Sequence, residues 1–132
     1  MNEEKIKCLL LINENKKITV TALAKKMNVS KATMSRMVSS FYEEGYTLEQ
    51  GKCLLSKKGK NYIEETKRKI KNLTYWLQKT SRLNEEEAHQ EAIKLFTTLN
   101  KETIERICSR IHFNQVFDQL GDLVEFSGHY LE

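Results

Sequence analysis

Apolar residues at helical spacing open the chain. Ile6, Leu9 and Leu10 fall on one face of a helix that this spacing predicts from Glu3 to about Asn13. The sequence contains no proline, so helices can run long and are expected to end at Gly, Asn or Ser. The pattern predicts a helix-rich fold.

Two further helices are predicted on either side of a short turn. The first covers residues 22–27, and the second begins at Lys31 and stops at Gly45, a residue type favoured just after a helix. Between them, Asn28 tolerates a left-handed backbone and Ser30 is placed to cap the second helix. The pattern therefore predicts a helix-turn-helix.

A different pattern follows the third helix. Residues 46–49 and 53–56 form two short segments joined by Gln-Gly-Lys, which predicts a β-hairpin. Ser56 is then placed to cap a long amphipathic helix that runs to about Thr80. A helix-turn-helix followed by a hairpin is the order of a winged helix.

The rest of the chain is predicted to be helical. Asn84 and Glu87 fit a capping box, Asn100 is placed to cap a further helix, and a last helix is expected over residues 113–131. The fold class is therefore mainly α with a small β-hairpin, a winged helix-turn-helix over residues 1–71 and a helical dimerisation domain over residues 72–132. Apolar side chains expected in the core or a dimer interface are Trp76, Leu77, Leu95, Phe96, Ile107, Phe117 and Leu120.

Charge is distributed unevenly between the two halves. Residues 1–71 carry 16 Lys and Arg against 8 Asp and Glu, a net charge of +8, whereas residues 72–132 carry 6 against 10, a net charge of −4. This asymmetry indicates that only the first half meets a polyanion. A solvated basic surface without a partner is the alternative.

Composition narrows the class of protein. A hydrophobic fraction of 39% beside 30% charged residues is typical of a folded domain. The apolar run near the start is too short for a signal peptide or a membrane span, so we expect a cytoplasmic location and no membrane partner.

Three widely spaced cysteines favour buried, reduced thiols. Motifs such as a glycine-rich phosphate loop, GxSxG or HExxH are missing from the sequence, so we expect no enzyme.

The helix-turn-helix carries the strongest functional signal. Short hydroxyl side chains on the outward face of its second helix let that helix lie deep in a major groove, and Arg36 is long enough to address guanine. Lysines at the hairpin and just after it can neutralise flanking phosphates. The predicted DNA-contacting residues are Ser30, Lys31, Thr33, Ser35, Arg36, Ser39, Lys52, Lys57 and Lys58. A helical hairpin that serves only as scaffold is the alternative.

Three segments resemble one family of regulators along nearly the whole chain. They are VTALAKKMNVSKATMSRMVSSFYEEGY, LLSKKGKNYIEETKRK and LNEEEAHQEAIKLFTTLNKETIERI, and their order and spacing are similar to those of the diphtheria-toxin-repressor and manganese-transport-regulator family. The helix-turn-helix alone also resembles the MarR-type regulators. The resemblance implies DNA contacts at Ser30, Thr33, Ser35 and Arg36, with Ala32 where the family often has proline.

The resemblance also implies a site for manganese or iron, but the family's ligands do not carry over. Their positions fall on Ile70, Thr74, Ile93, Phe96 and Thr97. Divalent transition ions need several converging N, O or S donors, and Ile and Phe offer none. We therefore predict a member that has lost the family's metal switch.

Weaker metal candidates lie elsewhere in the chain. The resemblance matches His89 to an ancillary ligand position of the family and Glu3 to an N-terminal ligand position. Glu105, Cys108 and His112 share one helical face and are chemically able to hold a soft ion. The alternatives are a surface arrangement around His89 and an ordinary helix flank for the other three.

Together these features predict a homodimeric transcriptional regulator, in the role of a repressor. Its two recognition helices would enter successive major grooves of a pseudo-palindromic operator in double-stranded DNA. Two other functions remain open at this point: a MarR-like regulator that responds to a small organic effector, and a winged-helix module that binds proteins.

Overall fold

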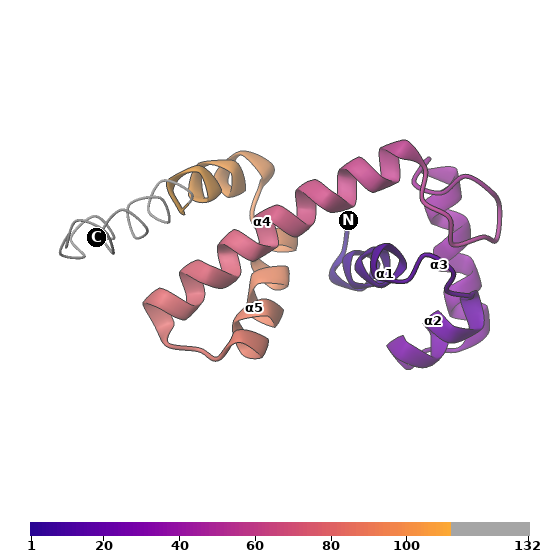
Figure 1. Cartoon of the computed structure of the whole chain (residues 1–132), viewed down its shortest axis with the longest axis horizontal. Helices are drawn as coiled ribbons and strands as arrows, with labels where there is room; N and C mark the ends of the chain where they lie inside the picture. The colour runs from indigo at the N-terminus through magenta and orange to yellow at the C-terminus, as the bar shows by residue number, and fades with distance from the viewer. Residues whose placement is uncertain (112–132) are drawn as a thin grey trace. The chain divides into compact units, whose positions relative to one another are not determined.

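The computed structural model describes residues 1–111, and within them the chain consists of helices joined by short connections and one longer hairpin-like turn (Figure 1). The predicted helix over residues 113–131, together with Phe117 and Leu120, lies outside the described residues. The chain divides into two compact units, the first covering Met1–Lys67 and the second beginning at Arg68. The helices are α1 (Glu3–Glu14), α2 (Val20–Met27), α3 (Lys31–Glu43), α4 (Lys57–Ser81) and α5 (Glu85–Thr98), followed by a helical segment over residues 101–111.

Side chains that accept hydrogen bonds from the first turn define where the helices begin. Thr19 Oγ1 accepts from the backbone N–H of Ala22 at 3.1 Å, and Ser30 Oγ accepts from that of Thr33 at 3.1 Å. Such N-caps satisfy donors that would otherwise lack an intrahelical partner. Asn28 ends α2 in the left-handed conformation, with φ 55°. The predicted helix-turn-helix is thus present.

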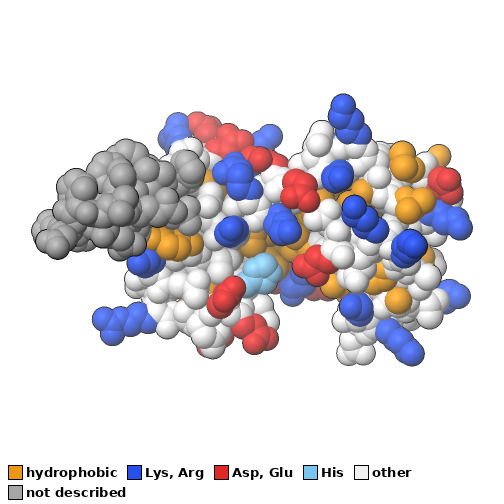
Figure 2. Space-filling model, in the orientation of Figure 1, with side chains coloured by type: hydrophobic (Ala, Val, Ile, Leu, Met, Phe, Trp, Pro, Cys, Tyr) orange, Lys and Arg blue, Asp and Glu red, His pale blue; other side chains and the backbone are white. Residues whose placement is uncertain are grey.

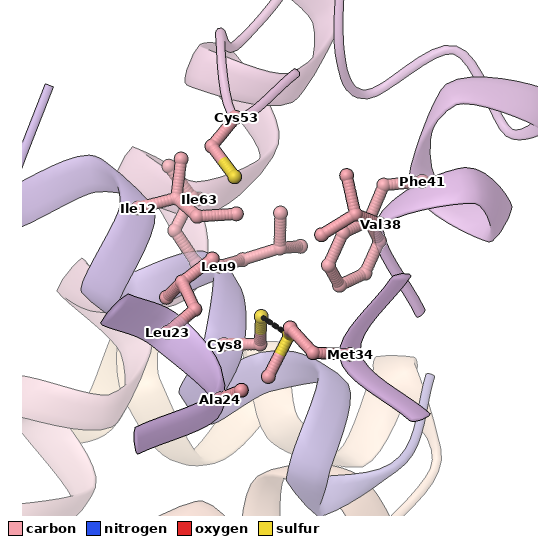
Figure 3. Close-up of a cluster of buried hydrophobic side chains, with 10 residues drawn as sticks. All are labelled: Cys8, Leu9, Ile12, Leu23, Ala24, Met34, Val38, Phe41, Cys53 and Ile63. Atoms are coloured by element: carbon pink, nitrogen blue, oxygen red, sulfur yellow. Dashed lines mark hydrogen bonds between the residues drawn. The ribbon is translucent and has the colours of Figure 1, made fainter. Parts of the chain in front are cut away.

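The core of the first unit draws side chains from α1, α2, α3, α4 and the turn that follows α3 (Figure 3). Leu9, Met34 and Phe41 are fully buried at its centre. Complete burial of a side chain of this size contributes about 1.5–3 kcal/mol. This cluster holds α3 with one face inward and leaves its other face for solvent.

Residues 46–56, here called the wing, follow the course of a hairpin without forming strands. Thr47 and Leu55 make one antiparallel bridge, and the N–H of Leu48 donates to the carbonyl of Leu54 at 2.9 Å. The next residues already turn, since the N–H of Lys52 donates to the carbonyl of Glu49 at 3.2 Å. One bridge is too short for a ladder, so the predicted β-hairpin is not confirmed as a pair of strands in the part of the chain described.

Helix α4 begins against the wing. The Ser56 hydroxyl accepts from the N–H of Gly59 at 3.0 Å, as the sequence predicts, and donates to the carbonyl of Gly45 at 2.6 Å. A Cβ at Gly59 would lie 2.0 Å from the carbonyl oxygen of Tyr46. The absence of a side chain at position 59 therefore allows this close approach.

The second unit packs α5 and residues 101–111 with the later residues of α4. Its buried apolar side chains are Ile70, Leu73, Ala88, Ala92, Ile93, Ile104, Cys108 and Ile111. The predicted capping box is present, because Asn84 Oδ1 accepts from the N–H of Glu87 at 2.8 Å and its amide donates to the Glu87 carboxylate. Asn100 caps the next helix through the N–H of Thr103 at 2.9 Å. Within residues 1–111, the helices are all too short or too polar to cross a membrane.

Candidate nucleic-acid interface

The outward face of α3 is polar and accessible. Lys31, Ser35 and Arg36 are exposed, whereas Thr33 and Ser39 are half-buried. Met34 and Val38, on the opposite face, are fully buried. The predicted contact residues of α3 therefore share one surface.

Hydrogen bonds order the side chains at the start of this surface. The Ser30 hydroxyl donates to Thr33 Oγ1 at 2.9 Å, and Arg36 Nη2 donates to the same oxygen at 3.4 Å. The guanidinium is thus held near the amino end of α3 by a weak contact. Its remaining N–H groups can donate in the paired geometry that suits the acceptor edge of guanine.

The wing is joined to α3 by a side-chain hydrogen bond. Gln50 Nε2 donates to the Ser39 hydroxyl at 2.8 Å. Sequence reasoning named Ser39 as a direct DNA contact, and the structure gives its hydroxyl an additional role in placing the wing beside α3.

A basic groove of about 610 Å³ lies between α3, the wing and the segment that leads into α2. Four lysines line it: Lys16, Lys17, Lys31 and Lys52. None of the four forms an ion pair with another of the described residues. Figure 2 shows Lys and Arg side chains spread over the face of the first unit that it displays. Four unpaired ammonium groups around one groove make it attractive to anions.

Sequence reasoning missed two of these lysines. It named Lys31 and Lys52 but neither Lys16 nor Lys17. The signal that could have found them is a pair of lysines just before the Thr19 cap of α2, because the first helix of a helix-turn-helix crosses the DNA backbone.

The two lysines at the start of α4 differ from each other. Lys58 Nζ donates to the carbonyl of Glu44 at 2.7 Å and lies 5.0 Å from the centroid of the Tyr46 ring. A cation at the carboxyl end of α3 satisfies a carbonyl that has no intrahelical partner. Both lysines are exposed, and Lys58 stabilises the end of α3 through this contact.

The residues at the family's ligand positions provide no donor set. Ile70 and Ile93 are buried at 1% and 2% exposure, and the Thr74 hydroxyl donates to the carbonyl of Ile70 at 2.7 Å. Phe96 and Thr97 are half-buried. Two of the five positions thus belong to an apolar core, and the Thr74 hydroxyl bonds to its own helix.

The weaker metal candidates do not converge within the described residues. Glu3 pairs with Lys7 at 3.6 Å, and His89 is exposed. Glu105 lies 3.5 Å from the ammonium of Lys69. No group of three His, Cys, Asp or Glu side chains within residues 1–111 is placed to share an ion. His112 lies outside these residues, so its grouping with Glu105 and Cys108 stays a prediction.

Two family models match the chain, one in each half. The model of the MarR family matches residues 1–47, and that of the iron dependent repressor, metal binding and dimerisation domain, matches residues 56–122, just over half of the chain. The chain belongs to the iron-dependent repressor family. The resemblance inferred from the sequence is thereby confirmed, including the MarR-like character of the first half. No curated protein matches the chain.

As a member of the iron-dependent repressor family, the chain is a transcriptional regulator of the metal-dependent repressor kind. The family implies a bound divalent ion, and the residues described here do not fit one. Isoleucine side chains fill the interior at positions 70 and 93, and these side chains offer an ion no N, O or S donor.

Proposed function

We propose that this regulator binds a pseudo-palindromic operator in double-stranded DNA as a homodimer and represses transcription. The observation that carries the proposal is the exposed polar face of α3 beside the lysine-lined groove. Base edges would meet Arg36 and the hydroxyls of α3, while lysines of the groove would neutralise phosphates. The chain would thus act by binding, with no catalytic step.

Dimer formation would use apolar surface of the second unit. Trp76 is 37% exposed, and Leu77, Leu95, Phe96 and Ile107 are half-buried. Apolar side chains that remain accessible in a folded unit favour burial against a partner. Two subunits related by a twofold axis would place their α3 helices about one turn of DNA apart.

We further propose that DNA binding does not require a divalent ion. Ile70 and Ile93 pack in the interior of the second unit. Their packing would hold this unit, without an ion, in the arrangement that bound metal fixes in the family. Chelator-treated protein is then expected to bind its operator as tightly as protein supplied with Mn²⁺ or Fe²⁺. A tenfold gain in affinity on adding either ion would contradict this part.

The test of DNA recognition compares two arginine variants. Arg36→Ala removes the proposed base contact and is expected to weaken operator binding by about 1–3 kcal/mol, or roughly 5- to 150-fold. Arg106→Ala is the matched control, because Arg106 is exposed in the second unit and pairs only with Glu102 among the described residues, at 2.7 Å. Fluorescence anisotropy with labelled duplex measures both.

Salt dependence tests the groove separately. Lys17→Gln is expected to weaken binding to all duplexes alike and to reduce the slope of log affinity against log salt by about 1. An affinity for duplex that does not change with salt would sink the proposal and favour a winged-helix module that binds proteins.

A further inference from the structure

Two leucines of the wing are exposed side by side. Leu48 and Leu54 are 61% and 44% exposed, and the N–H of Leu48 donates to the carbonyl of Leu54 at 2.9 Å. Within residues 1–111, neither side chain belongs to the core cluster of the first unit or packs against it, in contrast to Leu55. Transfer of such apolar surface out of water is favourable. The pair therefore contributes little to the fold and is available to a binding partner.

Lysines surround this pair of leucines. Leu54 lines the basic groove with its four lysines, and both leucines line a smaller hollow together with Lys16 and Lys60. Figure 2 shows apolar side chains among the lysines of the first unit. Cations around an apolar pair favour a partner that offers negative charge and apolar surface together. Duplex DNA does so, because its phosphates border grooves in which the bases can be reached.

The wing is placed to reach a second groove of such a duplex. Gln50, which lies between the two leucines in sequence, donates to the Ser39 hydroxyl of α3 at 2.8 Å, and the basic groove lies between α3 and the wing. With α3 in a major groove, the phosphates at the edge of that groove would run along the lysines. Beyond this row of phosphates lies the adjacent minor groove. The leucines of the wing would therefore meet the minor groove.

We propose that Leu48 and Leu54 form an apolar wedge that enters the minor groove and opens one base step of the duplex. Leucine cannot hydrogen-bond to the polar edges of the bases. Hydrocarbon inserted at a base step instead unstacks that step in part and kinks the duplex by about 20–90° toward the major groove. This inference rests on the proposed DNA binding and adds to it a deformation that base contacts by α3 do not require.

The wedge also makes binding depend on the sequence of the opened step. Pyrimidine–purine steps such as TA and CA are easily unstacked, whereas A-tracts are stiff. Because Gln50 ties the wing to α3, one flexible step is expected at a fixed distance from the base pairs that α3 contacts. Replacing this step with an A-tract is expected to weaken binding without removing any contact to α3.

The first experiment measures bending of a duplex that the full chain selects from a random pool. Donor and acceptor dyes at the two ends of the duplex report the bend, and 2-aminopurine in the flexible step reports unstacking by a rise in its fluorescence. The parent protein is expected to bend the duplex by about 20° or more and to raise the 2-aminopurine signal. A duplex that stays straight when bound overturns the proposal.

Three variants assign the bend to the two leucines. The double variant Leu48→Ser/Leu54→Ser is expected to lose most of the bend and to bind the duplex about tenfold more weakly, because it removes buried hydrocarbon and keeps every lysine. Leu48→Met/Leu54→Met retains apolar side chains of similar volume and is expected to bend the duplex like the parent. Leu83→Ser, at a half-buried leucine between α4 and α5, is the matched control and is expected to change neither bend nor affinity. Circular dichroism of each variant establishes that it is folded.

Salt dependence identifies the kind of contact that the serine variant loses. An unchanged slope of log affinity against log salt is expected, because an apolar contact releases no counterions. A slope reduced by about 1 would mean that a phosphate contact was lost instead, and it would overturn the wedge.

The outcomes separate the wedge from the proposed function. A serine double variant that binds and bends the duplex like the parent overturns the wedge and leaves DNA binding supported. It would favour a protein partner for the two leucines. A chain that binds no duplex refutes the proposed function, and the wedge with it.

Discussion

The two units bury different kinds of polar side chain: the first buries the hydroxyls of Thr47 and Thr66, whereas the second buries an ammonium and an amide as well. The core cluster of the first unit is made of apolar side chains and thiols, with Leu9, Val38 and Phe41 fully buried. The second unit also buries polar side chains on α4, including Lys69 and Asn72, at 7% and 6% exposure. Lys69 pairs with Glu105 at 3.5 Å. The interior of the second unit thus contains an ammonium group as well as isoleucines.

The proposed DNA-contacting residues and the family's metal-ligand positions therefore lie in different units. The proposed DNA contacts are surface residues of the first unit, and their placement depends on a core that needs no ion. The second unit keeps the helices that the dimerisation-domain match implies, but isoleucines fill two positions where the family has ligands. A change in the interior of the second unit can therefore leave the recognition surface of the first unit intact.

The largest effect is expected when a ligand-type side chain is placed in the second unit. Ile93→Glu puts a carboxylate at a position that is 2% exposed, and an unpaired buried charge costs more than about 4 kcal/mol. Ile93→Val, the control, is expected to cost about 0.5–1.5 kcal/mol. Urea unfolding measures both. In the presence of chelator, equal stability of the Ile93→Glu and Ile93→Val proteins would contradict this prediction. It would mean that position 93 accommodates a charged carboxylate.

A smaller effect is expected in the first unit at Gly59. Gly59→Ala would place a Cβ 2.0 Å from the Tyr46 carbonyl oxygen, and the resulting overpacking costs about 1–3 kcal/mol. Gly51→Ala is the control, because nothing lies within 4 Å of its Cβ, although its φ of +73° still disfavours alanine. Thermal unfolding should show the larger loss for Gly59→Ala, and a stabilised Gly59→Ala variant would contradict the contact with Tyr46.

Helix caps should contribute equally in the two units. Thr19→Ala and Asn84→Ala each remove an oxygen that accepts a backbone N–H at the start of a helix, at 3.1 Å and 2.8 Å. Each is expected to cost about 1 kcal/mol in urea unfolding. A loss confined to one variant would show that the other helix start is held by packing instead of its cap.

The smallest effect on stability at neutral pH is expected from ionisation of the buried Cys8 thiol, because this group releases its proton only in alkaline solution. Burial, together with the nearby Cys53, raises the pKa of Cys8 from 9.0 to about 12. The folded state therefore keeps this proton at a pH where the unfolded chain releases it, so stability is complete below pH 9 and falls as the pH rises toward 12. Cys8→Ala should flatten this alkaline decline. An unchanged slope would assign the decline to other groups.

Local features of the fold were predictable from the sequence. The caps at Thr19, Ser30 and Asn84 act on N–H groups three residues later, so a short sequence window contains the whole interaction. The wing was harder to predict. Two short segments joined by Gln-Gly-Lys are compatible with strands, but the single Thr47–Leu55 bridge depends on where the turn begins.

The candidate site was predictable only in part. The outward face of α3 follows from helical spacing, which is why Ser35 and Arg36 were named. The partners of Lys58 and the basic groove around Lys16 and Lys17 arise from contacts between segments distant in sequence. Periodicity and capping rules carry no information about such contacts.

The hydrogen bond between Gln50 and Ser39 has a consequence for how operators would be distinguished under the proposed function. Because the wing is fastened to α3, the spacing between the base pairs read by α3 and the phosphates met by the wing is set by the protein. A duplex whose groove width differs from that spacing must deform to fit, and the cost of deformation depends on its sequence. Base steps that this protein never touches would then contribute to its choice of operator.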